Sequence, residues 1–195
     1  LAKPLVAKPG AEYEYSSLTS LLLAELITRT LTSSRDPRTR ANAYRVFAEE
    51  RLFRPTGITT AVLDFDGAGT QVGGSIIYMS LGDWGRFGQL LLDGQGRGGE
   101  QVIAPDWLSF LRTPSPTNGS YGGHVWLNRP VPPGQDAVLF PDKASQQAFA
   151  AIGHLGQYII VSPEQRTVLV RLGKTQDEQL GPVRDALGKV MASLP

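Results

Sequence analysis

The chain has 195 residues, of which 41% are hydrophobic, as is typical of one globular domain or a large part of one. Its 19 basic and 18 acidic residues give a net charge of +1, which excludes an electrostatic basis for binding nucleic acid or an anionic membrane. It has no cysteine, which excludes disulfides and thiolate-bound metals, and no apolar run long enough to predict a membrane-spanning helix.

The first third of the chain predicts two helices. The serine pair at 16–17 is typical of an N-cap, and leucines with helical spacing follow it, so we expect a helix to about Leu31. The Asp-Pro pair at 36–37 predicts the start of a second helix, with aspartate as N-cap and proline in the first turn. We expect this helix to end near 54–57, where proline and glycine follow.

Short strands and two further helices are expected next. Residues 58–78 are rich in glycine and contain short β-like pieces. Ser80 and Asp83 have the spacing of a capping box, which predicts a helix that ends at Gly94. Pro105 begins another short helix.

The last third of the chain predicts an antiparallel sheet followed by a helix. A loop rich in proline and glycine covers 129–136, and a short turn at 162–166 joins the last two strands. The predicted strands are 121–128, 147–152, 157–161 and 167–172, and the predicted C-terminal helix is 182–194. This order indicates an α+β fold in which the final helix packs on one face of the sheet.

Two segments carry side chains suited to catalysis. Tyr15 lies directly before a helix N-terminus, where a phenol could accept or relay a proton. His154 lies between Gly153 and Gly156, which let a ligand approach the backbone, so the N–H of Gln157 could donate to an oxyanion. Each residue also has a purely structural interpretation, as a tyrosine that packs and as a histidine that is hydrogen-bonded in a turn.

Two similar residues are interpreted as structural. Tyr13 lies two residues before Tyr15, and we expect it to pack. His124 alternates with apolar residues on the predicted strand 121–128, so we expect it to have a structural role as well.

The segment around Asp64 and Asp66 offers a rival function. It resembles the Asp-x-Asp motif of haloacid-dehalogenase-type phosphatases, in which one aspartate is a nucleophile beside magnesium. Ala68 stands where threonine or valine is expected, and the motif follows two helices rather than forming the end of a leading strand. A magnesium-dependent phosphatase is therefore retained only as an alternative.

Four segments together resemble the serine β-lactamase-related hydrolases. This family includes class C β-lactamases, D-alanyl-D-alanine peptidases, esterases and 6-aminohexanoate-dimer hydrolases. The order and spacing of the four segments agree with the family over most of the chain. The segments are Pro9-Gly10 with Tyr15-Ser16-Ser17, the stretch 52–59, the stretch 74–92 with its Asp-x-x-Arg-Phe-Gly pattern, and Gly153-His154-Leu155-Gly156-Gln157.

The resemblance implies acyl transfer through a serine ester, with no cofactor. Tyr15 would handle the nucleophile's proton, His154 would occupy the position of a family lysine, and Gln157 would offer one oxyanion-hole N–H. Ser17, where asparagine is usual, and Gly156 would contact a small-molecule ester or amide substrate. Histidine in place of lysine favours esters or small amides over carboxylate-bearing β-lactams.

The family's Ser-x-x-Lys segment is not in this sequence, because no lysine has a serine three positions before it. We therefore expect residues 1–195 to be the C-terminal portion of an incomplete β-lactamase/transpeptidase-like fold. About 10–115 would form its mainly helical part, and about 120–195 would form its strands and C-terminal helix. A companion segment or chain would carry the nucleophile and cover exposed apolar surface.

The resemblance favours a periplasmic or secreted location. The alternative is a non-catalytic binding or scaffold module.

Overall fold

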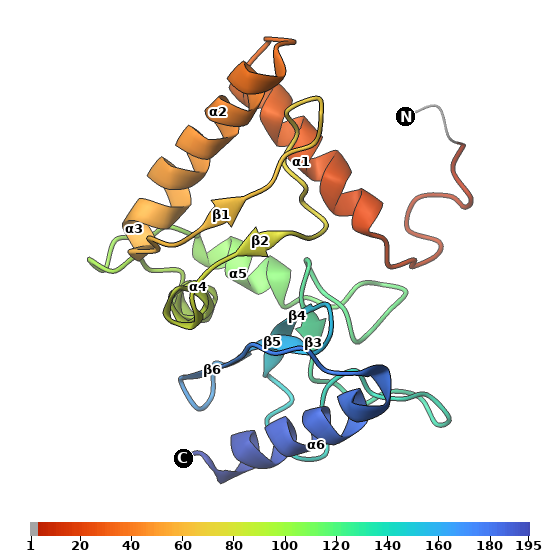
Figure 1. The fold of residues 1–195 in the computed structure, drawn as a ribbon. Coiled ribbons are helices and arrows are strands. Elements are labelled where there is room, and N and C mark those ends of the chain that lie inside the picture. The colour runs from red at the N-terminus through yellow and green to blue at the C-terminus, as the bar shows by residue number, and fades with distance from the viewer. Residues whose placement is uncertain (1–3) are drawn as a thin grey trace. The chain divides into compact units, whose positions relative to one another are not determined.

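The structure, a computed structural model, describes residues 4–195 and has the predicted α+β fold (Figure 1). Its contacts divide the chain into two compact units. The helical unit is Ser16–Ala104. The sheet unit combines the N-terminal stretch that ends at Tyr15 with Pro105–Pro195. Within the described residues, none of the helices has the length and apolarity needed to cross a membrane.

The helical unit begins with α1 (Ser17–Leu31) and α2 (Pro37–Ala48), which a short loop joins in Figure 1. Both helices begin where the sequence predicts. The Ser16 hydroxyl accepts from an N–H of the first turn of α1, and the Asp36 carboxylate accepts from the Thr39 N–H of α2 at 2.8 Å. These two side chains satisfy backbone donors that a helix start leaves free.

The second helix does not continue regularly to its predicted end. After α2 the chain forms one π-helical segment, η1 (Glu49–Phe53), and a last turn, α3 (Arg54–Thr56). Gly57 then ends the helix with a positive φ of 73°. The π segment directs Phe53 into an apolar cluster of this unit, where it packs with Ala48 and Ile58.

A small hairpin and a fourth helix complete the helical unit. Strands β1 (Val62–Leu63) and β2 (Ile77–Tyr78) pair in antiparallel fashion. Helix α4 (Leu81–Asp93) follows, with its Ser80 N-cap accepting from the Asp83 N–H at 3.2 Å. A complete capping box would also have the Asp83 side chain accept from the Ser80 N–H. That part of the prediction is wrong, because the Ser80 N–H donates to the Thr60 hydroxyl instead.

The Asp83 carboxylate is fully buried and joins the start of α4 to the segment before β1. It accepts from the Thr60 hydroxyl and from the N–H groups of Thr59 and Thr60 at 3.0 and 2.7 Å, and it pairs with Arg86. The Thr60 hydroxyl, with these other donors, lowers the pKa of Asp83 to about 2 in spite of its burial. This network accounts for the Asp-x-x-Arg spacing in the sequence.

The sheet unit contains the short helix α5 (Pro105–Leu111) and a four-stranded antiparallel sheet. The strands follow one another in the order β3-β4-β5-β6, and each pairs with the next along the chain. Their bounds are β3 (Trp126–Leu127), β4 (Phe149–Gly153), β5 (Gln157–Ser162) and β6 (Thr167–Arg171). The last three agree with the predicted strands to within two residues.

Burial of β5 explains why its sequence is continuously apolar. Tyr158 and Ile160 pack against α6 (Asp177–Ser193), while Ile159 and Val161 point to the opposite face and are also buried. Figure 1 shows α6 along one side of the sheet, as the sequence predicts. A strand buried on both faces has no polar side to present to water.

Two predicted boundaries are wrong. The strand predicted at 121–128 is mainly a turn, because Gly122 donates its N–H to the Val125 carbonyl, and only Trp126–Leu127 forms a strand. The C-terminal helix begins at Asp177 rather than at Pro182, which lies within the first turns of α6. Pro182 is the sixth residue of α6 and has no N–H, so it cannot donate to the Glu178 carbonyl one turn earlier.

We expect Asp83→Asn to lower the free energy of unfolding by about 2–4 kcal/mol, because an amide NH₂ would face the donors that the carboxylate now accepts from. The stabilisation depends on the charged carboxylate. It is therefore complete above the ordinary pKa of 3.8 and is lost as the pH falls toward the folded value of about 2. Urea unfolding between pH 2 and 7 measures both effects.

Asp185 provides the matched control. Its pKa is also lowered to about 2, by Lys143 and then Lys189, but its side chain is 40% exposed. Asp185→Asn should change the stability far less, because solvent screens exposed ion pairs. Equal losses for the two variants would contradict the role given to the buried network.

Candidate active site

The turn between β4 and β5 presents His154. Gly153 pairs with Gln157 across the hairpin, and His154, Leu155 and Gly156 form the turn. Leu155 and Gly156 both have positive φ, at 58° and 77°, so the chain reverses tightly. The His154 side chain is exposed, and no hydrogen bond to its ring occurs within residues 4–195. Its imidazole is therefore accessible to a ligand.

The segment after β6 braces this turn. The Arg171 guanidinium donates to the Gly156 carbonyl and, at 2.7 Å, to the Thr175 hydroxyl. The Thr175 N–H donates to the Leu155 carbonyl at 3.0 Å. A Cβ at Gly156 would lie 2.9 Å from the end of the Leu180 side chain, and the positive φ of 77° would strain any other residue there. The backbone that leads into Gln157 is thus held on two sides.

Tyr15 lies at the end of the N-terminal stretch, and its ring contacts two aromatic residues of the sheet unit. It stacks on Trp126 with ring centroids 5.5 Å apart and meets Tyr121 edge-on at 5.8 Å. Tyr121 in turn packs edge-on against Trp126 at 4.8 Å and contacts Tyr13 at 5.3 Å. Such pairs each contribute about 0.5–1.5 kcal/mol beyond the area that they bury. Tyr15 itself remains 57% exposed.

Burial raises the pKa of two of these phenols. It raises the pKa of Tyr121 to about 12, with smaller contributions from the neighbouring Tyr13 and Tyr15. Burial also raises the pKa of Tyr13, and the neighbouring Tyr15 raises it by a smaller amount. Both shifts further favour the protonated phenol, and Tyr15 is the exposed phenol of the group.

Ser17 lies in the first turn of α1, in the helical unit, and its side chain is exposed. A Cβ at Gly74 would lie 2.8 Å from the Ser17 Cβ, and one at Gly73 would lie 2.7 Å from the Ser20 carbonyl oxygen. The glycine pair therefore packs closely along the start of α1. Ser16, the neighbour of Ser17, serves as the helix cap.

The sheet unit contains four of the five residues predicted for the site: Tyr15, His154, Gly156 and Gln157. Trp126, which carries the Tyr15 ring, pairs with Ala150 of β4, and His154 directly follows that strand. At 3.3 Å per residue, Ala150 and His154 are about 13 Å apart along the chain. Across residues 4–195 there is no direct hydrogen bond between Tyr15 and His154. The two residues are connected through the sheet, by the stacking of Tyr15 on Trp126 and the pairing of β3 with β4.

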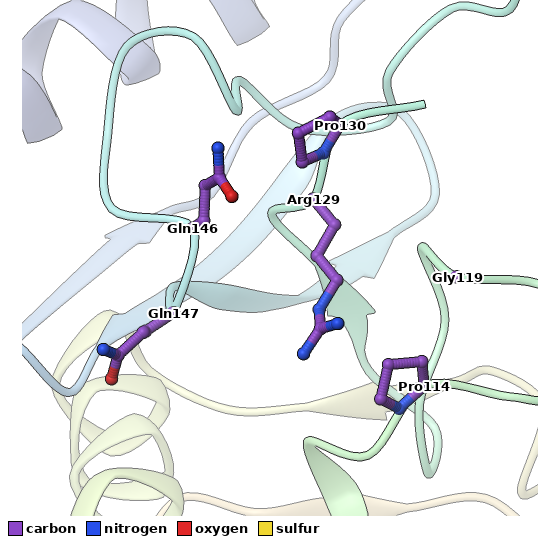
Figure 2. Close-up of a pocket in the computed structure, with 6 residues that line it drawn as sticks. All are labelled: Pro114, Gly119, Arg129, Pro130, Gln146 and Gln147. Carbon is purple, nitrogen blue, oxygen red and sulfur yellow. The ribbon is translucent and has the colours of Figure 1, made fainter. Parts of the chain in front are cut away.

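The pocket in Figure 2 lies apart from these residues. It has a volume of about 550 Å³ and is lined by Pro114, Gly119, Arg129, Pro130, Gln146 and Gln147. Gln147 precedes β4 and His154 follows it, so about 23 Å of extended chain separates them. The pocket is thus at the opposite end of β4 from the turn that presents His154.

The acidic segment of the rival phosphatase hypothesis stabilises a loop. The Asp66 carboxylate accepts from the N–H groups of Ala68 and Thr70 at 2.9 and 2.8 Å, while Asp64 is exposed. Within residues 4–195 no group of three or more acidic or histidine side chains is arranged to hold a metal ion. The carboxylate of Asp66 therefore has a local role as an acceptor for backbone donors.

No sequence motif points to the two residues that contact Tyr15. Tyr121 and Trp126 were included in a predicted strand, where side chains five positions apart point to opposite faces. The signal that could have found them is the glycine pair at 122–123, since adjacent glycines between aromatic residues are typical of a tight turn. Such a turn brings its two ends together, and here Tyr121 pairs directly with Trp126.

Tyr13→Phe tests the packing in this cluster. The Tyr13 hydroxyl is buried and has no hydrogen-bond partner within residues 4–195. Removing it should leave the free energy of unfolding unchanged or raise it by up to about 1 kcal/mol, because a buried unpaired hydroxyl is destabilising. Tyr13→Leu should lower it by about 1 kcal/mol through loss of the ring contact with Tyr121. Chemical denaturation measures both, and a clear loss in Tyr13→Phe would indicate an unrecognised partner for the hydroxyl.

Three solved structures share this fold at low sequence identity. A provisionally assigned 6-aminohexanoate-dimer hydrolase from Bacillus anthracis has a TM-score of 0.68 and 21% identity, over 97% of this chain and 47% of that protein. A β-lactamase from Mycobacterium bovis has a TM-score of 0.64 and 18% identity, over 96% of this chain and 64% of that protein. A provisionally assigned β-lactamase from Bacteroides dorei has a TM-score of 0.57 and 14% identity, over 91% and 56%.

These comparisons establish the fold and the family but not a substrate. The chain spans roughly half to two thirds of the length of the three structures. No curated protein sequence matches it significantly. The model of the beta-lactamase family matches residues 1–190. The chain therefore belongs to the beta-lactamase family.

Proposed function

We propose that this chain contributes Tyr15, His154 and the backbone N–H of Gln157 to a serine hydrolase that cleaves an ester or amide bond. The observation that carries the proposal is that an exposed phenol and an exposed imidazole belong to one sheet unit, each supported by its own rigid contacts. Membership of the beta-lactamase family supports the class of reaction. A cofactor is not required for this chemistry.

The proposed reaction passes through an acyl-enzyme. A serine hydroxyl from a Ser-x-x-Lys segment attacks the carbonyl carbon, and the carbonyl π electrons move to the oxygen. The Tyr15 phenol accepts the hydroxyl proton while it passes its own proton to the uncharged lysine amine. The proton returns through Tyr15 to the leaving group when the ester or amide bond breaks. The N–H groups of the serine and of Gln157 stabilise the oxyanion. Water then attacks the acyl-enzyme by the same steps and releases the acid.

His154 and Gly156 would contact the substrate next to the reacting carbonyl. A neutral imidazole offers one donor and one acceptor, whereas a lysine in the same place offers a fixed positive charge. This difference favours an uncharged ester or small amide over a substrate that bears a carboxylate. On the helical unit, the Ser17 hydroxyl would be a shorter hydrogen-bonding group than the asparagine usual in the family.

The nucleophile would come from a companion segment that packs on α1. The outward leucines of this helix, Leu18, Leu22 and Leu26, recur every four residues and are 62%, 43% and 55% exposed. The opposite side of α1 buries Ala24 and Thr28. Leucines that recur on the exposed side of a helix favour an apolar partner, so we infer that a further apolar segment covers these three leucines.

The labelling of serine by a fluorophosphonate probe tests the proposed function. The chain is co-expressed with a polypeptide that carries a Ser-x-x-Lys segment, and the products are analysed by intact mass spectrometry. The expected result is a label on the companion serine, and no label on this chain by itself. Tyr15→Phe should slow labelling by about 10²- to 10⁴-fold, because the phenol no longer accepts the proton.

Tyr13→Phe is the matched control, since it removes a phenol hydroxyl from the same cluster and should leave the rate unchanged. If the companion binds and remains unlabelled under all conditions, the chain acts as a non-catalytic binding module. A rate in Tyr15→Phe equal to that of the unmodified chain would remove Tyr15 from the mechanism.

Leu22→Gln tests the companion interface. Loss of one buried leucine contact should weaken binding of the companion by about 10- to 100-fold, and should leave the thermal stability of this chain unchanged because Leu22 is exposed. Fluorescence anisotropy of a labelled companion measures the affinity. Val190→Gln is the control, because Val190 on α6 is 44% exposed and lies in the sheet unit. Equal effects of the two substitutions would place the companion elsewhere.

A further inference from the structure

Tyr15 needs a support that regular secondary structure does not provide. It precedes the Ser16 cap of α1, outside any helix or strand. Within residues 4–195 its hydroxyl forms no hydrogen bond, and more than half of the side chain is exposed. A tyrosine at such a position would sample several rotamers unless its ring is held by packing.

We propose that Tyr121 and Trp126 form an aromatic clamp that positions the phenol of Tyr15 for proton transfer. This inference rests on the proposed function, and it makes Tyr121 and Trp126 positioning residues rather than catalytic ones. Trp126 stacks under the Tyr15 ring at an interplanar angle of 28°, which fixes the plane of the ring. Tyr121 meets the same ring edge-on at 89°, which limits sliding within that plane.

The clamp itself is held by rigid backbone. Tyr121 and Trp126 pair across a tight turn, in which His124 has a φ of 63°. A Cβ at Gly122 would lie 2.1 Å from the carbonyl oxygen of Leu111, the last residue of α5. The Gly123 N–H donates to that same oxygen at 2.9 Å. The end of α5 therefore seats the turn so closely that a side chain is excluded at Gly122, and a Cβ at Gly123 would lie only 3.1 Å from the Leu111 side chain.

The clamp also connects Tyr15 to the rest of the candidate site. Trp126 pairs with Ala150 of β4, the strand that leads directly into the turn of His154. The Tyr121 phenol is neutral at pH 7, and burial raises its pKa further, to about 12, so the clamp places no negative charge beside Tyr15. A phenol held at a fixed place on this sheet meets the requirement that proton transfer has for an aligned donor and acceptor.

The ring position can be measured without any activity. The chain is labelled with ¹³C at the tyrosine Cε positions, and the Tyr15 signal is assigned with Tyr15→Phe. Tyr78, which is 61% exposed, provides an internal reference of similar accessibility. We expect the Tyr15 ring protons to resonate upfield of those of Tyr78, because the Trp126 ring current shields them. Trp126→Leu should abolish this difference, and Trp126→Phe should retain part of it.

Trp107→Leu is the control, because it removes an exposed tryptophan that pairs with Phe110 instead of with the clamp. An unchanged signal of Tyr44 and an unchanged far-UV circular dichroism spectrum show that each variant is folded. A Tyr15 signal that coincides with that of Tyr78 in the unmodified chain would overturn the proposal. A shift that persists in Trp126→Leu would overturn it as well.

The catalytic consequence is measured separately, on the complex with the companion segment. Trp126→Leu should slow fluorophosphonate labelling by about 10- to 100-fold, and Trp126→Phe should restore most of the rate. If Tyr15→Phe slows labelling and Trp126→Leu does not, positioning by the clamp is refuted while the proposed function stands. If neither substitution slows labelling, the role of Tyr15 in the proposed function fails, and the resonance shift still reports whether the ring is held.

Discussion

Burial of β5 in the middle of the four-stranded sheet is the constraint on which the candidate site depends. Its side chains are covered on both faces, and α6 packs against one of them through Leu187 and Met191. A slip of one residue in the pairing of β5 with β4 would turn each buried side chain to the wrong face. The register is therefore strongly determined, and with it the place of the turn at His154 and of Trp126 on the neighbouring edge strand.

In the helical unit, charged side chains connect segments that are far apart in the sequence. Asp83 is fully buried and accepts from donors on two segments that are more than twenty residues apart in the sequence. Glu25 of α1 pairs with Arg40 of α2 and accepts from Thr70 at 2.6 Å, which ties the loop before β2 to both helices. In each case the buried or half-buried charge has several partners, which offsets its loss of hydration.

The surface of α1 and the length of the matched structures lead to the same expectation. A helix with leucines on its outward side is suited to a protein interior, and the related structures have about one and a half to two times the length of this chain. The proposed companion segment would supply both the missing apolar cover and the nucleophilic serine. The chain would then provide the proton-handling phenol and one oxyanion donor, and the companion would provide the group that forms the covalent bond.

Local signals in the sequence were sufficient for most of the secondary structure. Ser16, Asp36 and Gly94 mark helix ends because their side chains or φ angles satisfy requirements that are local to a helix terminus. The apolar run of β5 indicates a buried strand for a similar reason. The family motifs likewise indicate Tyr15 and the turn of His154 as candidate site residues. The start of α6 was missed because proline usually marks a first turn, whereas here the helix begins five residues earlier.

Only the tertiary structure decided what surrounds these residues. The sequence pattern predicts that Tyr121 and Trp126 belong to one strand. The Leu111 carbonyl instead fills the space beside Gly122 and accepts the Gly123 N–H, and the chain turns. The contacts of Tyr15 with these rings, and those of Arg171 with the Gly156 carbonyl, join residues that are far apart in the sequence. Periodicity and capping rules describe neighbours along the chain, so the sequence by itself determined the elements and the family, and packing decided which side chains meet.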